Sequence, residues 1–115
     1  MLVKQLFKWI LSFFIKEDKE FKLKIVSELP AEPLENILYL EGNVLEKDYW
    51  YALLKCPCGC GDKIMLNLIT DSKPCWSVVF KKELPTVFPS IWRTKNCESH
   101  FWLKRGKIIW AGENI

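Results

Sequence analysis

Three cysteines occupy alternate positions of one short stretch, the segment CPCGCG at residues 56–61. Further along the chain, Cys97 is followed three residues later by His100, which is the only histidine. This spacing lets both side chains turn toward one point, and thiolate and imidazole are ligands that zinc prefers. A single buried cysteine packs as a small hydrophobe, but packing does not require this repeated spacing. The sequence therefore predicts a site for one Zn²⁺ ion with sulfur and nitrogen ligands.

Five candidate ligands exceed the four positions of a closed tetrahedral site. We predict Cys97 and His100 as one pair, because no other cysteine lies near the histidine. Cys58 and Cys60 form the predicted second pair, since each precedes a glycine that lets the backbone fold back toward sulfur. Cys56 is the reserve ligand, which would take the place of Cys58 or Cys60. A disulfide or a set of inert thiols is the alternative.

The composition limits the class of protein. A chain of 115 residues has room for one small domain, which gains stability from a bound metal. Its 50% hydrophobic and 14% aromatic residues exclude a disordered chain. The net charge of +3 comes with scattered lysines and does not favour nucleic acid. Five cysteines without a recognisable signal peptide predict a reducing, cytoplasmic location, and Cys75, next to Trp76, is expected in the core.

The N-terminal segment has the pattern of an amphipathic helix. Polar residues recur every four positions from Lys4 to Lys16, and apolar residues occupy most positions between them. The apolar run is too short to span a bilayer. We therefore expect a helix that packs on its own domain or on a partner. Peripheral binding to a membrane surface through residues 1–16 is the alternative.

The remaining chain alternates in the manner of short β-strands separated by turns. The expected strands are 21–25, 38–40, 50–54, 63–68, 76–80 and a hairpin formed by 101–103 and 108–110. Pro85 and Pro89 bracket residues 86–88, so any strand there is expected at an edge. The predicted fold class is mainly β (α+β): a small antiparallel β-domain over residues 21–115, with zinc joining two hairpins, preceded by a helix over residues 1–20.

Several motifs in order resemble those of a family of small bacterial zinc-binding proteins. They are CPCGCG (56–61), PCW (74–76), PSIWR (89–93), CESHFWL (97–103) and GKIIW (106–110). The genes of this family lie beside those of ubiquitin-like modifiers and their conjugating enzymes, in operons linked with phage defence. The resemblance implies a ubiquitin-like protein or its conjugating enzyme as partner, and it matches Cys58, Cys60, Cys97 and His100 to the ligand motifs.

Two functions agree with such a partner. The first is an adaptor or ligase-like binding module, in which four protein ligands close the zinc site and leave no place for a substrate water. The alternative is a hydrolase that processes or removes the modifier. It would use zinc with Glu98 or Asp62 as proton acceptor, or Ser90 or Ser99 as nucleophile if His100 were free of metal.

Nucleic-acid binding is a third and less favoured hypothesis. Lys104, Arg105 and Lys107 cluster at the predicted hairpin turn, and Arg93 lies in the preceding loop. Hairpin ends are commonly charged for solubility, which explains the same residues more simply. Likewise, the aromatic residues Trp92, Phe101, Trp102 and Trp110 are expected in the core rather than at an interface.

Overall fold

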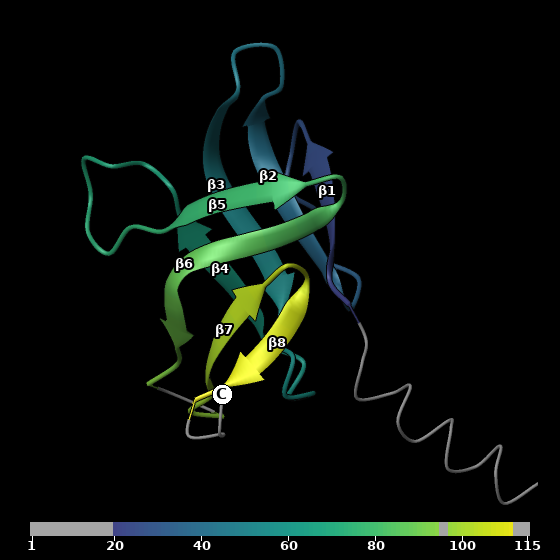
Figure 1. Ribbon diagram of the computed structural model, residues 1–115, viewed down its shortest axis with the longest axis vertical. Helices are drawn as coiled ribbons and strands as arrows, with labels where there is room; N and C mark the ends of the chain where they lie inside the picture. Colours follow the sequence, from purple (N-terminus) through teal and green to yellow (C-terminus); the bar gives the residue numbers. More distant parts are fainter. Residues whose placement is uncertain (1–19, 95–96, 112–115) are drawn as a thin grey trace, which may run out of the picture.

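Two four-stranded sheets make up the part of the chain that the computed structural model describes, residues 20–94 and 97–111. The first sheet has the strand order β1-β2-β3-β4 and the second has β5-β6-β7-β8. The strands are β1 (Lys22–Val26), β2 (Ile37–Asn43), β3 (Asp48–Lys55), β4 (Lys63–Asn67), β5 (Ser77–Lys81), β6 (Leu84–Trp92), β7 (His100–Lys104) and β8 (Lys107–Trp110). In Figure 1, β5 and β6 cross in front of β2 and β3.

The alternation of side chains along each strand decides which residues meet between the sheets. In the first sheet, the core face carries Leu38 and Leu40 from β2, with Ala52 and Leu54 from β3. In the second sheet, Val87 and Ile91 of β6 face the same core with Phe101 and Leu103 of β7. The core therefore lies between the inner faces of the two sheets. The side chains on the outer face of the second sheet do not belong to this core.

Backbone hydrogen bonds also join the two sheets at one end. The amide of Phe21 donates to the carbonyl oxygen of Gly106 at 2.6 Å, and that of Leu23 donates to Glu83 at 2.7 Å. Gly106 has a positive φ of 80°, and a Cβ there would lie 2.7 Å from the Phe21 carbonyl oxygen. Glycine is thus required both by the turn and by the close approach of the first sheet.

The expected fold class is wrong in two respects. The described residues form an all-β protein without a helix, so the α+β assignment does not hold for them. The sheets are also not wholly antiparallel, because β1 pairs with β2 in parallel. The predicted helix and its membrane-binding alternative fall on residues outside the described part.

The prediction of an edge strand at residues 86–88 is wrong as well. β6 pairs with β5 on one side and with β7 on the other, so it lies inside the second sheet. The pairing of β6 with β7 is interrupted between Val87 and Ile91, where the register shifts. Pro89 lies in this irregular segment, where no ladder hydrogen bond is needed from its nitrogen.

The described part of the chain contains no helix with the length and hydropathy needed to cross a membrane.

Replacement of Leu54 by alanine tests the shared core. Leu54 is fully buried on β3, so Leu54→Ala is expected to lower the free energy of unfolding by about 2–5 kcal/mol through lost burial and a residual cavity. Leu45→Ala is the control, because Leu45 is 94% exposed, and its effect should stay within about 0.5 kcal/mol. Urea denaturation followed by tryptophan fluorescence measures both values. Equal effects of the two substitutions would contradict the core described above.

Candidate functional site

The first candidate site is formed where the loop between β3 and β4 meets the segment between β6 and β7. Cys56 follows β3 directly and continues the inward-facing series of Ala52 and Leu54, which makes it 4% exposed. Gly59 and Gly61 have φ values of +92° and +87°, and these left-handed conformations turn the loop back on itself. The loop thereby directs its thiols toward Cys97, which arrives from the second sheet.

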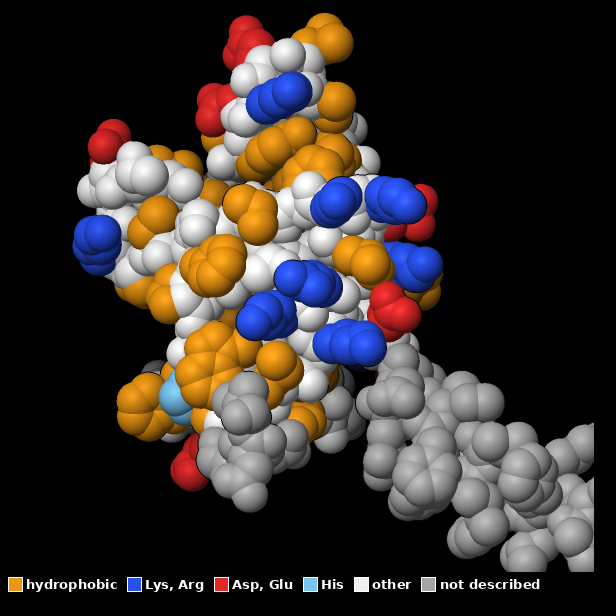
Figure 2. Space-filling view, in the orientation of Figure 1, with side chains coloured by type: hydrophobic (Ala, Val, Ile, Leu, Met, Phe, Trp, Pro, Cys, Tyr) orange, Lys and Arg blue, Asp and Glu red, His pale blue; other side chains and the backbone are white. Residues whose placement is uncertain are grey.

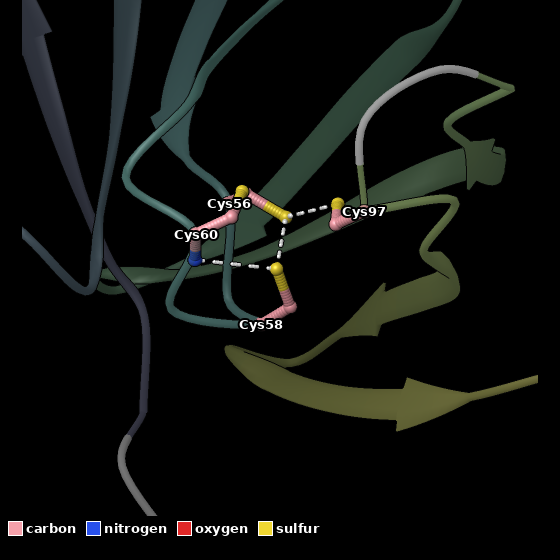
Figure 3. A group of neighbouring side chains, drawn as sticks. All are labelled: Cys56, Cys58, Cys60 and Cys97. Atoms are coloured by element: carbon pink, nitrogen blue, oxygen red, sulfur yellow. Dashed lines mark hydrogen bonds between the residues drawn. The ribbon is translucent and has the colours of Figure 1, made fainter.

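Four sulfur atoms gather at this meeting point, as Figure 3 shows. The Sγ atoms of Cys56, Cys58, Cys60 and Cys97 all lie within 4.8 Å of one another. The Sγ of Cys56 lies 3.4 Å from that of Cys58 and 3.5 Å from that of Cys97. All five cysteines of the chain, Cys75 included, are free of disulfides.

The thiols differ in how readily they ionise. Hydrogen bonds from the side chain and the backbone of Ser99 lower the pKa of Cys97 to about 6. The Ser99 hydroxyl donates to the Cys97 sulfur at 3.1 Å. Burial raises the pKa of the Cys56 thiol to about 12. Cys97 therefore ionises more readily than the buried Cys56.

A positive side chain balances this sulfur-rich region. The Arg93 guanidinium donates to a carboxylate oxygen of Asp62 at 3.2 Å and is drawn electrostatically to Cys97 and Cys56. Burial opposes its charge, but the hydrogen bond to Asp62 and these attractions raise the pKa of Arg93. Its Nη1 atom is buried and has no hydrogen-bond partner among the described residues. Arg93 therefore links the segment after β6 to the residue that precedes β4.

The residues present fit a metal ion. Four thiolates with metal–sulfur distances of about 2.3 Å require sulfur atoms about 3.8 Å apart in a tetrahedron, close to the separations found here. Bound thiolates would carry excess negative charge, which suits the neighbouring Arg93 and its unpaired Nη1. The amide of Cys60, which donates to the Cys58 sulfur at 3.3 Å, stabilises a thiolate in the same way. The four cysteines could therefore hold a metal ion.

A second candidate site lies on the outer face of the second sheet. The Ser90 Oγ and the His100 Nε2 are 2.9 Å apart, within hydrogen-bond distance. Trp92 is paired with His100 across β6 and β7, so Ser90, two residues before Trp92, lies diagonally opposite the histidine on the same face. Ile91 and Phe101 point the other way, into the core. A serine hydroxyl bonded to an imidazole is the arrangement that activates a nucleophile.

The imidazole is held between two indole rings. The Trp92 ring stacks on it with centroids 5.1 Å apart, and the Trp102 ring lies at 5.4 Å, tilted by 33°. Trp92 and His100 form a pair without ladder hydrogen bonds, because the Arg93 amide bonds to Ser99 and the His100 carbonyl bonds to Ala111. Side chains approach closest in such pairs. Figure 2 shows the histidine at the surface beside hydrophobic side chains.

The structure thus divides the predicted ligands between two sites. It brings Cys58, Cys60 and Cys97 together and adds Cys56, the reserve ligand, whereas His100 bonds to Ser90. The alternation of side chains along a strand could have shown from the sequence that Cys56 and His100 point to different faces. Cys56 is in phase with the inward residues of β3, and His100 is out of phase with the inward residues Phe101 and Leu103 of β7.

The remaining candidates also have assigned places. Ser99 is buried and bonded to Cys97, which leaves it away from the imidazole. Glu98 is exposed, and Cys75 is half-buried outside the thiol group. Among the aromatic residues, Phe101 is in the core as expected, while Trp92 is 66% exposed. Trp92 is therefore an exception to the expectation of burial.

The fold and the two sites define a small two-sheet β-protein with a metal-competent thiol cluster and a serine–histidine pair on opposite sides of one sheet. The family model of the bacterial ubiquitination-like system serine protease (BubE) matches residues 25–111. This covers more than half of the chain, which therefore belongs to that family. Neither the search of curated proteins nor the search of solved structures found a match.

The family assignment confirms the expected connection with a bacterial ubiquitination-like system. It also bears on the choice between an adaptor and a hydrolase. The description of the family as a serine protease agrees in part with the hydrolase that we gave as the alternative to the adaptor.

Metal content of single variants tests the ligand set. Cys56→Ala should lose the bound metal because it removes a central sulfur, whereas His100→Ala should retain it because the ring bonds to Ser90. Cys75→Ala is the matched control, a cysteine outside the group. Inductively coupled plasma mass spectrometry of the purified proteins gives the stoichiometry. Metal retained in Cys56→Ala and lost in His100→Ala would favour the mixed sulfur–nitrogen set instead.

Alkylation of the metal-free protein tests the ionisation of the thiols. With a pKa of about 6, Cys97 is mainly thiolate at neutral pH and should react with iodoacetamide before Cys56, whose pKa is about 12. The Cys97 rate should fall as the pH drops below about 6, because the thiolate becomes protonated. Peptide mass spectrometry identifies the modified residue. Preferential labelling of Cys56 at neutral pH would contradict the assignment.

Proposed function

We propose that this protein is a serine protease that cleaves a ubiquitin-like modifier from its precursor or conjugates, with Ser90 as nucleophile and His100 as general base. The observation that carries the proposal is the 2.9 Å contact between the Ser90 Oγ and the His100 Nε2. Both residues lie within the segment matched by the serine protease family. The substrate class comes from the description of that family.

The reaction follows from the positions of the two side chains. With its proton on Nδ1, the imidazole accepts the Ser90 hydroxyl proton at Nε2 as Oγ forms a bond to the substrate carbonyl carbon. Collapse of the tetrahedral intermediate breaks the bond to the leaving amine, which receives that proton from the imidazolium. Water then gives a proton to the imidazole as it attacks the acyl-enzyme carbonyl. Collapse of this second intermediate breaks the bond to Oγ, which takes the proton back from the imidazolium as the carboxyl product leaves.

The two indoles support this role of His100. An imidazolium forms in each half of the reaction, and both ring centroids lie within about 6 Å, the range over which an aromatic face attracts a cation. The rings also restrict the tilt of the imidazole. No carboxylate is hydrogen-bonded to His100 among the described residues. We propose that Trp92 and Trp102 supply the orientation that an aspartate supplies in a catalytic triad.

The thiol group has a structural role in this proposal. Cys56, Cys58, Cys60 and Cys97 would hold one zinc ion, whose four positions they fill. The ion would join the β3–β4 loop to the segment that leads into β7, and so fix the start of the strand that carries His100. The chemistry is assigned to Ser90 and His100 alone.

The other hypotheses have less support from the described contacts. Glu98 is exposed and Ser99 is committed to Cys97, so neither is placed to act with the imidazole. Asp62 is paired with Arg93. The adaptor function and the nucleic-acid hypothesis stay predictions without a contact in their favour. A link with phage defence and a cytoplasmic location likewise stay predictions.

Replacement of the proposed nucleophile tests the function. Ser90→Ala and His100→Gln should each lower kcat/KM for a fusion of a ubiquitin-like protein to a reporter by at least about 10³-fold, since each removes half of the reacting pair. Ser77→Ala is the matched control, an exposed serine on the neighbouring strand β5. Fluorophosphonate labelling with mass spectrometry should place the adduct on Ser90. Full activity of Ser90→Ala with its metal retained would refute the proposal.

A further inference from the structure

A groove adjoins the serine–histidine pair and is not used by the mechanism above. It has a volume of about 330 Å³ and is lined by residues 63–66 of β4, Trp76, and residues 91–94 at and after the end of β6. Trp92 belongs both to the groove and to the ring stack on His100. The indole nitrogen of Trp76 donates to the Ser90 carbonyl oxygen at 3.2 Å. Two residues that line the groove, Trp76 and Trp92, therefore contact the serine–histidine pair.

One wall of the groove is the open edge of the first sheet. Among the described residues, β4 is the last strand of that sheet and has β3 as its only ladder partner. The Cys56 amide donates to the Asp62 carbonyl and the Leu68 amide to the Trp50 carbonyl, so even-numbered residues of β4 bond toward β3. The backbone groups of Lys63, Met65 and Asn67 consequently point away from β3.

A hydrogen bond outside the sheet confirms that the odd-numbered residues of β4 direct their backbone groups away from β3. The Asn67 carbonyl accepts a hydrogen bond from the Trp76 amide at 2.8 Å, outside the sheet. Within the described residues, the amides of Lys63 and Met65 have no backbone or side-chain acceptor. An extended peptide placed in the groove would satisfy them.

The β6 side of the groove offers a further backbone pair. The Arg93 amide donates to the carbonyl oxygen of Ser99, the residue before β7, so in this segment Trp92 and Ser90 have their backbone groups directed away from β7. The Ser90 carbonyl already accepts from Trp76, which agrees with this direction. β5 pairs with β6 only as far as Phe88, and therefore leaves the Trp92 backbone open to the groove.

The charge of the groove restricts its ligand. Lys63 and Arg93 are among its lining residues, all of which are described, and no carboxylate is. Arg93 is neutralised by Asp62, whereas the Lys63 ammonium donates to the Ala31 carbonyl and lies 4.0 Å from Glu32. The exposed indole of Trp92 and the side chain of Met65 add apolar surface. This combination suits a peptide with neutral or acidic side chains.

We infer that this groove binds the extended C-terminal tail of the ubiquitin-like substrate as an added β-strand, paired with the backbone of Lys63 and Met65 on β4 and guided past Trp92 to Ser90. The inference rests on the proposed function for its substrate class. Strand addition at an open sheet edge takes affinity from backbone hydrogen bonds at alternate residues of the ligand. It would present the scissile carbonyl beside the nucleophile in one fixed register.

The test is a backbone methylation scan of a peptide. The probe is a fluorescein-labelled peptide with the C-terminal sequence of a ubiquitin-like protein from a bacterial ubiquitination-like system, N-methylated at one position at a time. Its affinity for the Ser90→Ala protein is measured by fluorescence anisotropy, so that no cleavage occurs. Losses of about five- to tenfold at alternate positions, with little change between them, are expected for a paired strand. Uniform losses, no losses or no binding would overturn the inference.

A pair of variants places the peptide on β4. In the Ser90→Ala background, Met65→Pro removes an outward amide and should weaken binding about five- to tenfold, while Met65→Ala keeps the amide and should weaken it less. The ladder with β3 does not use that amide, so the fold should persist in both variants. Equal affinity of the two variants, both folded by circular dichroism, would overturn the placement. If Met65→Pro does not fold, the placement is tested by crosslinking a photoreactive form of the probe peptide to the Ser90→Ala protein. Crosslinks to β4 are expected, and crosslinks found only elsewhere would overturn the placement.

Fluorophosphonate labelling separates this inference from the proposed function. Labelling of Ser90 requires the serine–histidine pair but not the groove, so it should be unchanged by Met65→Pro in the otherwise wild-type protein. Alternating peptide binding without labelling of the wild-type serine would support the groove and refute the protease. Labelling without peptide binding would refute the groove and leave the protease standing.

Discussion

Four sulfur atoms that come from the two sheets lie close together, and this closeness constrains how the sheets meet. Cys56, Cys58 and Cys60 belong to the turn between β3 and β4, and Cys97 belongs to the segment that enters β7. Several thiolates at this distance would repel one another unless a cation lay among them. Hydrogen bonds from Ser99 lower the pKa of Cys97, whereas burial raises that of Cys56. A cation held there would also join the two sheets at the end where β7 begins.

The start of β7 matters because successive side chains of this strand point to opposite faces of the second sheet. Phe101 and Leu103 point inward to the core, while His100 and Trp102 point outward. The register with β6 then sets Trp92 directly across from His100 and Ser90 diagonally across from it. A shift of one residue would turn the imidazole inward and break its contact with Ser90. The position of the histidine is thus controlled by the pairing of these two strands.

The irregular part of β6 connects this pair to the groove. Where the register with β7 shifts, the strand leaves the side of β5 and comes alongside the open edge of β4. Trp76 spans the gap, with its backbone amide on Asn67 and its indole nitrogen on Ser90. Two strand edges with outward backbone groups therefore lie along one groove beside the proposed nucleophile Ser90. Such an arrangement is what a protease needs in order to hold an extended chain without relying on large side chains.

Most strands could be predicted from the sequence, because the alternation of apolar and polar residues is a local property. The hairpin of β7 and β8 was expected near its observed position, and so was the gathering of Cys58, Cys60 and Cys97. The parallel pairing of β1 with β2 and the interior place of β6 could not be predicted, since they depend on contacts between segments far apart in the chain.

The composition of the two sites can be read from the sequence: a group of closely spaced thiols, one imidazole and a few serines. How these residues combine depends on the packing and pairing of the strands. The three-residue spacing of Cys97 and His100 is compatible with a shared metal, but spacing does not specify the face of the sheet to which each side chain points. Pairing of β6 with β7 and packing of the two sheets specify it, and these place Cys56 with the other thiols and His100 with Ser90. The physical reason is that strand register sets side-chain direction, and register is settled by partners distant in sequence.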